Sequence, residues 1–223
     1  SALAGPDDWT ELTARAYDRN DMFRGLENRG LLPWEEEVFA EFLPEPPATL
    51  VVGAAGAGRE MIELAASGYR VSGFEPAVGL AAVARREARC CVEIASYEQI
   101  FEAPPASMSG GFDAGILGWG SLSHLASPKQ ARRAVLAVRR LVPRGNLILS
   151  WVDDRPGELE LSQRRVLTRM GLPTLDERSG YTLHGGFSRT YSMDEIFRLA
   201  VRTGHRVIRY QEGQYPHAVF ALR

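Results

Sequence analysis

The stretch from Leu50 to Glu60 constrains the fold more than any other part of the sequence. It opens with three apolar residues, two of them β-branched, which is typical of a short buried strand. A loop of glycine and alanine follows from Gly53 to Gly58, and an apolar pattern with helical spacing begins at Arg59. This order suits the binding of a nucleotide-like ligand, because small residues allow close approach and the first helical N–H groups face the ligand.

A second strand is predicted over residues 69–75, and it ends in an acid, Glu75, followed by Pro76. The carboxyl end of this strand lies beside the glycine loop in a βαβ unit, so a carboxylate there can bind both hydroxyls of a ribose. The spacing does not fit the Gly-x-Gly-x-x-Gly fingerprint of NAD-binding proteins. If the fingerprint starts at Gly56, its third glycine falls at Met61. If it starts at Gly53, its second glycine falls at Ala55.

These residues resemble the class I S-adenosylmethionine-dependent methyltransferases, whose first loop reads Gly-x-Gly-x-Gly and whose second strand is followed by an acid. Gly56, Gly58 and Glu75 match that pattern. The sequence departs from it at two places. Ala54 replaces the first glycine, and the pair Val51-Val52 stands where the family often has an acid.

The resemblance implies S-adenosylmethionine as the cofactor, with Glu75 on its ribose. Ser96 and Tyr97 follow a third predicted strand, where the family places residues beside the adenine, and Tyr97 either stacks on the base or packs in the core. Gly118 and Trp119 follow a fourth, at the edge where doubly wound sheets bind ligands. The cofactor-binding residues implied in this way are Gly53, Ala54, Ala55, Gly56, Gly58, Glu75, Pro76, Ser96, Tyr97, Gly118 and Trp119.

The rest of the chain completes an α/β fold. Ser127 caps a helix predicted over 128–141, a fifth strand follows over 147–152, and two final β segments cover 206–211 and 217–222. The expected architecture is therefore a doubly wound, mostly parallel, seven-stranded sheet with a C-terminal antiparallel hairpin. This is the Rossmann-like methyltransferase fold, and the hairpin distinguishes it from the all-parallel NAD-binding fold.

Three parts of the chain are expected to have different roles. Residues 48–223 form the methyltransferase domain, and residues 1–47 a helical extension that packs against it or covers the substrate as a lid. Residues 153–190 are too long for a plain connection, contain a predicted helix over 158–170, and read as a substrate-side insertion. The predicted substrate-binding residues are Tyr17, Phe23, His124, Asp153, His184 and Arg189.

Composition narrows the choice of partners. A net charge of −2 gives no general attraction to nucleic acid or to an anionic membrane. The Asn/Asp-Pro-Pro-Tyr loop of enzymes that methylate bases or glutamine amides is missing after the fourth strand, which favours a small-molecule acceptor. No apolar run is long enough for a transmembrane span or a signal peptide, and we expect a cytoplasmic protein with no metal.

The expected activity is methyl transfer to oxygen or nitrogen. A hydroxyl acceptor often benefits from a general base, whereas a neutral amine needs none, and His124 is the best-placed candidate base. A histidine that enters a helix and bonds to the backbone is the structural alternative. Two alternative functions are kept for the whole chain. One is a non-catalytic S-adenosylmethionine-binding protein, and the other, less favoured, is an NAD-type oxidoreductase.

Overall fold

The computed structural model describes residues 6–19, 25, 29–152, 179–182 and 186–223. The predicted helix over 158–170 lies outside these ranges. Within them, none of the helices combines the length and the apolarity needed to span a bilayer.

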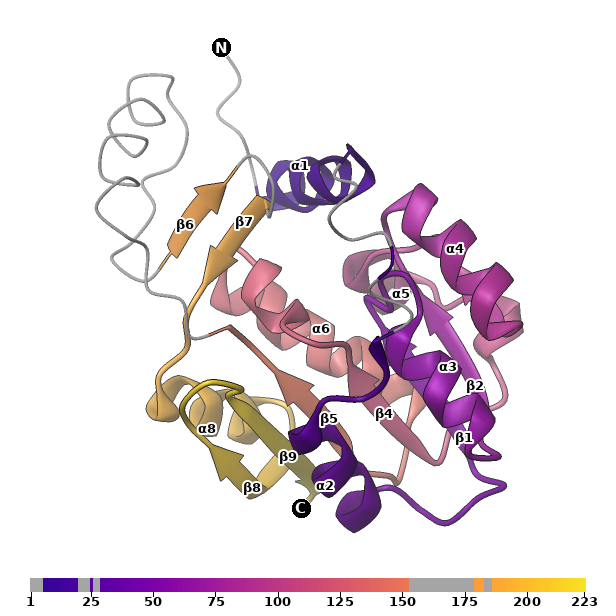
Figure 1. Ribbon diagram of the computed structural model, residues 1–223. Helices are drawn as coiled ribbons and strands as arrows, with labels where there is room; N and C mark the ends of the chain where they lie inside the picture. The colour runs from indigo at the N-terminus through magenta and orange to yellow at the C-terminus, as the bar shows by residue number, and fades with distance from the viewer. Residues whose placement is uncertain (1–5, 20–24, 26–28, 153–178, 183–185) are drawn as a thin grey trace.

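A seven-stranded sheet with the order β3-β2-β1-β4-β5-β9-β8 forms the centre of the molecule (Figure 1). Neighbouring strands from β3 to β5 pair in parallel, while β9 runs antiparallel to both β5 and β8. This confirms the fold predicted from the sequence, including its C-terminal hairpin. The strands are β1 Thr49–Gly53, β2 Arg70–Phe74, β3 Cys91–Glu93, β4 Ala114–Leu117, β5 Leu147–Ser150, β8 His205–Gln211 and β9 His217–Leu222.

Helices cover both faces of the sheet (Figure 1). Because successive strand side chains point to opposite faces, Leu50 and Val52 pack with one helix layer and Val51 with the other. The first layer consists of α2 Pro33–Phe42, α3 Arg59–Ala66 and α4 Val78–Ala88. The second consists of α5 Tyr97–Glu102, α6 Pro128–Leu141 and α8 Met193–Arg202. The 3₁₀ turns η3 Ala106–Met108 and η4 Ser121–His124 lie before and after β4.

Local signals explain the predicted helix starts. The Ser127 hydroxyl accepts a hydrogen bond from the N–H of Gln130 and caps α6. Ser192 and Glu195 form a capping box at the start of α8. The six-residue helix α5, with its own capping box at Ser96, was not predicted.

Helix α1, Pro6–Arg19, lies beside strand β7, Gly186–Arg189, at the carboxyl edge of the sheet (Figure 1). β7 pairs antiparallel with β6, Ser179–Thr182, in a separate two-stranded sheet. The ring of Trp9 packs against that of Phe187, with centroids 5.6 Å apart, and the Phe187 N–H donates to the Thr13 hydroxyl at 3.0 Å. These contacts fix α1 and β7 together above the carboxyl edge, where open α/β sheets generally bind their ligands.

Candidate functional site

The glycine loop after β1 is built on an alternation of left-handed residues. Ala54, Gly56 and Gly58 have φ values of 50°, 56° and 92°. Left-handed backbone strains a residue that carries a Cβ, which explains why glycine is favoured at each of these positions. Ala54 therefore adopts a left-handed conformation that favours glycine, although it carries a Cβ.

Two further predicted glycines are required by close packing. A Cβ on Gly53 would lie 2.6 Å from Cζ of Phe74, and one on Gly118 would lie 2.7 Å from the carbonyl oxygen of Ala54. The Gly118 N–H also donates to the Gly53 carbonyl at 2.8 Å, which joins the ends of β1 and β4. These glycines position the loop backbone through close packing rather than through side chains.

Glu75 follows β2 and lies under the glycine loop. Its two carboxylate oxygens accept hydrogen bonds at 2.8 Å from the backbone N–H groups of Gly56 and Ala77. Burial raises the pKa of Glu75 to about 7, opposed by those two N–H donors and assisted by the nearby charge of Asp18. A carboxylate oxygen can accept more than one hydrogen bond, so each retains capacity for a ligand hydroxyl.

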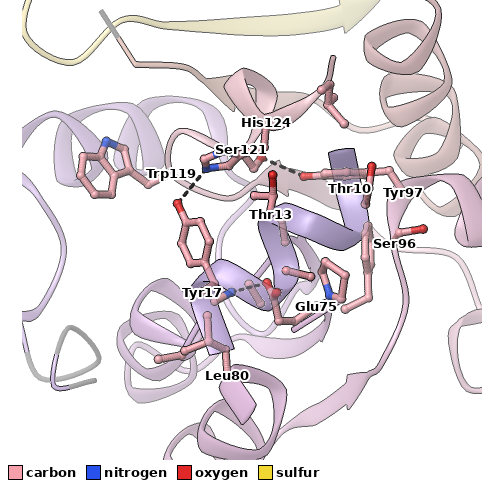
Figure 2. Close-up of a pocket in the computed structure, with 18 of the residues that line it drawn as sticks. Thr10, Thr13, Tyr17, Glu75, Leu80, Ser96, Tyr97, Trp119, Ser121 and His124 are labelled. Atoms are coloured by element: carbon pink, nitrogen blue, oxygen red, sulfur yellow. Dashed lines mark hydrogen bonds between the residues drawn. The ribbon is translucent and has the colours of Figure 1, made fainter. Parts of the chain in front are cut away.

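A cavity of about 170 Å³ lies between the glycine loop and α1 (Figure 2). It brings together most of the predicted site residues from segments far apart in the sequence. The predicted residues that line it are Tyr17, Ala54, Ala55, Gly56, Glu75, Pro76, Ser96, Tyr97, Trp119 and His124.

Tyr17 and His124 meet across this cavity (Figure 2). Nδ1 of His124 lies 2.6 Å from the carbonyl oxygen of Phe187, which can only accept, so Nδ1 carries the proton. Nε2 is then an acceptor, and the Tyr17 hydroxyl, 2.8 Å away, donates to it. Burial lowers the pKa of His124 and raises that of Tyr17, so both groups are neutral in this arrangement.

Two residues predicted beside the adenine also have structural contacts. The Ser96 hydroxyl caps α5 by accepting from the N–H of Gln99. Tyr97 is buried, packs edge-on against Phe74 with ring centroids 5.1 Å apart, and shares a 2.9 Å hydrogen bond with Ser121. Tyr97 therefore packs in the core while its ring edge borders the cavity.

At the opposite wall, the start of α3 meets the loop after β4. The N–H of Trp119 donates to Oε1 of Glu60 at 3.0 Å, and the Trp119 side chain is 45% exposed. Glu60 is itself buried and pairs with Arg59 at 3.1 Å. The sequence analysis did not identify Arg59 and Glu60 as site residues.

One predicted substrate residue lies away from this cavity, and three others fall on residues that the structure does not describe. Arg189 is buried, forms an ion pair with Glu195 at 2.9 Å, and is not among the described residues that line the cavity. Phe23, Asp153 and His184 lie outside the described residues. The sequence analysis also missed several lining residues on α1, on α4, in the segment after β4 and at the start of α6. They include Thr10, Thr13, Leu80, Ser121, Leu125 and Gln130. The only indication for them in the sequence was that they lie near residues already predicted for the site.

Solved structures share this architecture. Magnesium protoporphyrin IX methyltransferase from Synechocystis, solved with bound S-adenosylmethionine, is 15% identical with a TM-score of 0.67, covering 100% of this chain and 100% of that chain. This chain has the class I methyltransferase fold. The 1,6-didemethyltoxoflavin-N1-methyltransferase from Burkholderia thailandensis, solved with 1,6-didemethyltoxoflavin and S-adenosylhomocysteine, is 15% identical with a TM-score of 0.61, covering 100% of this chain and 92% of that chain.

A third similar structure carries the name of another class of enzyme. A protein from Rhodobacter sphaeroides named as a Zn-dependent alcohol dehydrogenase is 15% identical with a TM-score of 0.68, covering 95% of this chain and 98% of that chain. No protein-family model and no curated protein matches the sequence. At these identities, the methyltransferase-fold matches establish the fold, and the assignment of chemistry rests on the site.

Proposed function

We propose that this protein is an S-adenosylmethionine-dependent methyltransferase that acts on a small molecule. The observation that carries the proposal is the buried carboxylate of Glu75, held by the N–H of Gly56 in the glycine loop. Two solved structures with this fold contain S-adenosylmethionine or S-adenosylhomocysteine, and a buried carboxylate beside a loop that admits close approach supports binding of the ribose hydroxyls. Bound cofactor supplies an electrophilic methyl group on its sulfonium.

A small acceptor is supported by what surrounds the cavity. Helix α1 and strand β7 cover the carboxyl edge of the sheet, so α1 serves as the proposed lid. Two similar solved structures are named for methylation of a porphyrin and of a toxoflavin precursor, both of them small molecules. We therefore favour an acceptor that fits under the lid over a macromolecule.

His124 is the proposed base for a hydroxyl acceptor, and Tyr17 the group that connects it to the acceptor. The Tyr17 hydroxyl donates to Nε2 of His124, and a hydroxyl oxygen can accept as well as donate, so Tyr17 is the proposed partner of the acceptor hydroxyl. Transfer would form the new C–O bond and break the methyl–sulfur bond, whose electron pair stays on sulfur to leave a neutral thioether. The acceptor proton would then pass to Tyr17 and the Tyr17 proton to His124. The Phe187 carbonyl keeps the imidazole in the tautomer that this transfer requires.

Two other functions are separated by binding and turnover. A non-catalytic protein would bind the cofactor and transfer no methyl group. An NAD-type oxidoreductase is disfavoured by the loop spacing and by the antiparallel strands β8 and β9. The Rhodobacter match does not favour a zinc enzyme, since the described residues contain no group of three or more His, Cys, Asp or Glu side chains able to hold a metal.

Calorimetric titration tests the proposal. S-adenosylmethionine and S-adenosylhomocysteine should bind the wild type, and NAD should not. Glu75→Ala should weaken cofactor binding by about 1.5–3 kcal/mol per lost charge-assisted hydrogen bond, while Glu63→Ala, on the nearby helix α3, should bind as the wild type does. Unchanged cofactor affinity in a folded Glu75→Ala variant would refute the ribose assignment. A separate screen for transfer of a labelled methyl group to a panel of hydroxyl and amine acceptors would distinguish an enzyme from a binding protein.

A further inference from the structure

Three charged side chains form a buried network at the start of α3. The Arg59 guanidinium donates to both carboxylate oxygens of Glu35, at 2.6 Å each, and to the carbonyl oxygen of Gly30 at 2.8 Å. It also lies 3.1 Å from Oε1 of Glu60. All three side chains are at least 90% buried, so their charges are poorly screened by solvent.

The charges in this network do not balance. One guanidinium lies between two carboxylates, which leaves one formal negative charge when all three are ionised. Glu35 takes the bidentate pairing with Arg59, whereas Glu60 receives one contact from Arg59 and one from the N–H of Trp119, both at Oε1. Oε2 of Glu60 makes no hydrogen bond to the described part of the chain. A buried, partly paired carboxylate is costly unless a cation completes it.

The imbalance lies at the cavity wall. Arg59 and Glu60 both line the cavity, as does Glu75. Glu75 follows β2, whereas Glu60 is tied to Trp119 after β4, and β2 and β4 flank β1 on opposite sides. The two acids therefore face the cavity from opposite sides of β1. A ligand with its ribose at Glu75 therefore extends toward Glu60 in one direction and toward Ser96 in the other.

The other end of the cavity offers no comparable charge. Glu98, which follows Ser96 and Tyr97, pairs with Arg133 and is neutralised by that partner. Adenine needs no ionic partner, whereas the amino-acid end of S-adenosylmethionine carries an ammonium group. Val51 and Val52, buried in the first strand, provide no carboxylate for it.

We propose that Glu60 binds the methionine ammonium group of S-adenosylmethionine, with Arg59 and Glu35 as positioning residues that hold its carboxylate at the cavity wall. The inference rests on the proposed function, because it specifies how the same cofactor is held. The cation completes the network, so two carboxylates and two cations balance once the ligand is bound. Arg59 is not assigned to the cofactor carboxylate, because its donors already serve Glu35, Gly30 and Glu60.

Calorimetry with ligand pairs tests this assignment without an activity assay. S-adenosylhomocysteine carries the amino-acid end, and 5′-methylthioadenosine keeps the adenosine and sulfur but lacks that end. Glu60→Gln should weaken S-adenosylhomocysteine binding by about 10- to 100-fold and leave 5′-methylthioadenosine binding within error. The matched control, Glu63→Gln on the same helix, should change neither. Equal effects of Glu60→Gln on both ligands, or none on either, would overturn the assignment.

A measurement on the wild type keeps the test independent of whether Glu60→Gln folds. An S-adenosylhomocysteine analogue with hydrogen in place of the amino group should bind the wild type at least about 10-fold more weakly than the parent ligand. Equal binding of the two would overturn the assignment while leaving the proposed function intact. Binding of neither S-adenosylhomocysteine nor 5′-methylthioadenosine would instead refute the proposed function itself.

Discussion

The Tyr17 hydroxyl donates a hydrogen bond to Nε2 of His124 across 2.8 Å, which joins helix α1 to the 3₁₀ turn after β4. The two rings also meet edge to face, with centroids 5.3 Å apart. The contact joins α1, the proposed lid, to the loop after β4. It therefore links the covering of the cavity with the proposed proton transfer.

The first prediction concerns this pair. With a hydroxyl acceptor, His124→Ala should lower turnover by about 10²- to 10⁴-fold and leave S-adenosylhomocysteine affinity within error. Tyr17→Phe should also lower turnover, because it removes the connecting hydroxyl and keeps the ring. Steady-state kinetics and calorimetry on the same preparations check both. A His124→Ala variant that loses thermal stability and keeps its turnover per folded molecule would assign the histidine a structural role.

The same pair predicts a pH profile. Burial lowers the pKa of His124 below its ordinary value near 6.5, so the imidazole stays neutral from alkaline pH down to that value and below. Turnover at saturating cofactor, where the ionisation of Glu75 near pH 7 does not limit binding, should therefore hold constant from pH 8 to about 6.5 and fall only on further acidification, as the base becomes protonated. A decline that begins above pH 7 at saturating cofactor would contradict the assignment.

Glu75 makes a prediction about stability without cofactor. Its pKa rises from an ordinary 4.5 to about 7 on folding, so the folded state binds the proton more tightly. The stabilisation from this group is present below pH 4.5 and is lost as the pH rises through 7. Between pH 5 and pH 8, the free energy of unfolding of Glu75→Gln should gain about 2–3 kcal/mol relative to wild type. Urea unfolding measures this, and a pH-independent difference would contradict it; Glu63→Gln is the control.

The central βαβ unit could be predicted from the sequence because its signals are local. The apolar run of β1, the glycine loop and Glu75 lie close together along the chain. The pattern of apolar residues and the glycines of the turn identify them directly. The helix α5 was missed because six residues give too short a pattern for helical periodicity. The C-terminal hairpin could also be predicted, because two β segments flank one short turn.

The contacts that define the cavity could not be predicted in the same way. Tyr17 and His124 are 107 positions apart, and Arg59 and Glu35 are 24 apart. Neither pair carries a sequence pattern that specifies its partner, because each contact depends on how helices pack on the finished sheet. Arg189, predicted as a substrate residue, forms an ion pair with Glu195 in the first turn of α8, and its place in the sequence did not indicate that contact.

Gly118 provides a test of the close approach between β4 and the glycine loop. The Cβ of an alanine there would lie 2.7 Å from the carbonyl oxygen of Ala54 and 3.0 Å from that of Gly53, so backbone must move. Gly118→Ala should destabilise the protein by about 1–3 kcal/mol and weaken cofactor binding, because the displaced loop carries Gly56. Chemical denaturation and calorimetry check both effects. Gly110→Ala, where a Cβ meets nothing within 4 Å, is the control, and equal behaviour of the two variants would refute the argument.

The last prediction concerns how α1 is held over the site. Oδ1 of Asp18 accepts a hydrogen bond at 2.8 Å from the N–H of Gly79, in the first turn of α4. Ala77, the N-cap residue of α4, has no side chain that can satisfy that turn, so Asp18 acts as a cap supplied by another helix. Asp18→Ala should cost about 1 kcal/mol of stability and speed hydrogen exchange in α1.

A second substitution separates the hydrogen bond of Asp18 from its charge. Asp18→Asn keeps a side-chain acceptor for the Gly79 N–H, so it should retain most of the stability and the slow exchange of α1. It also removes the charge that helps to raise the pKa of Glu75, and the pH at which Glu75 ionises should therefore fall. Glu11→Ala, on the exposed face of α1, is the control for both measurements. If Asp18→Ala and Glu11→Ala exchange α1 amides at the same rate, Asp18 does not hold the helix over the cavity.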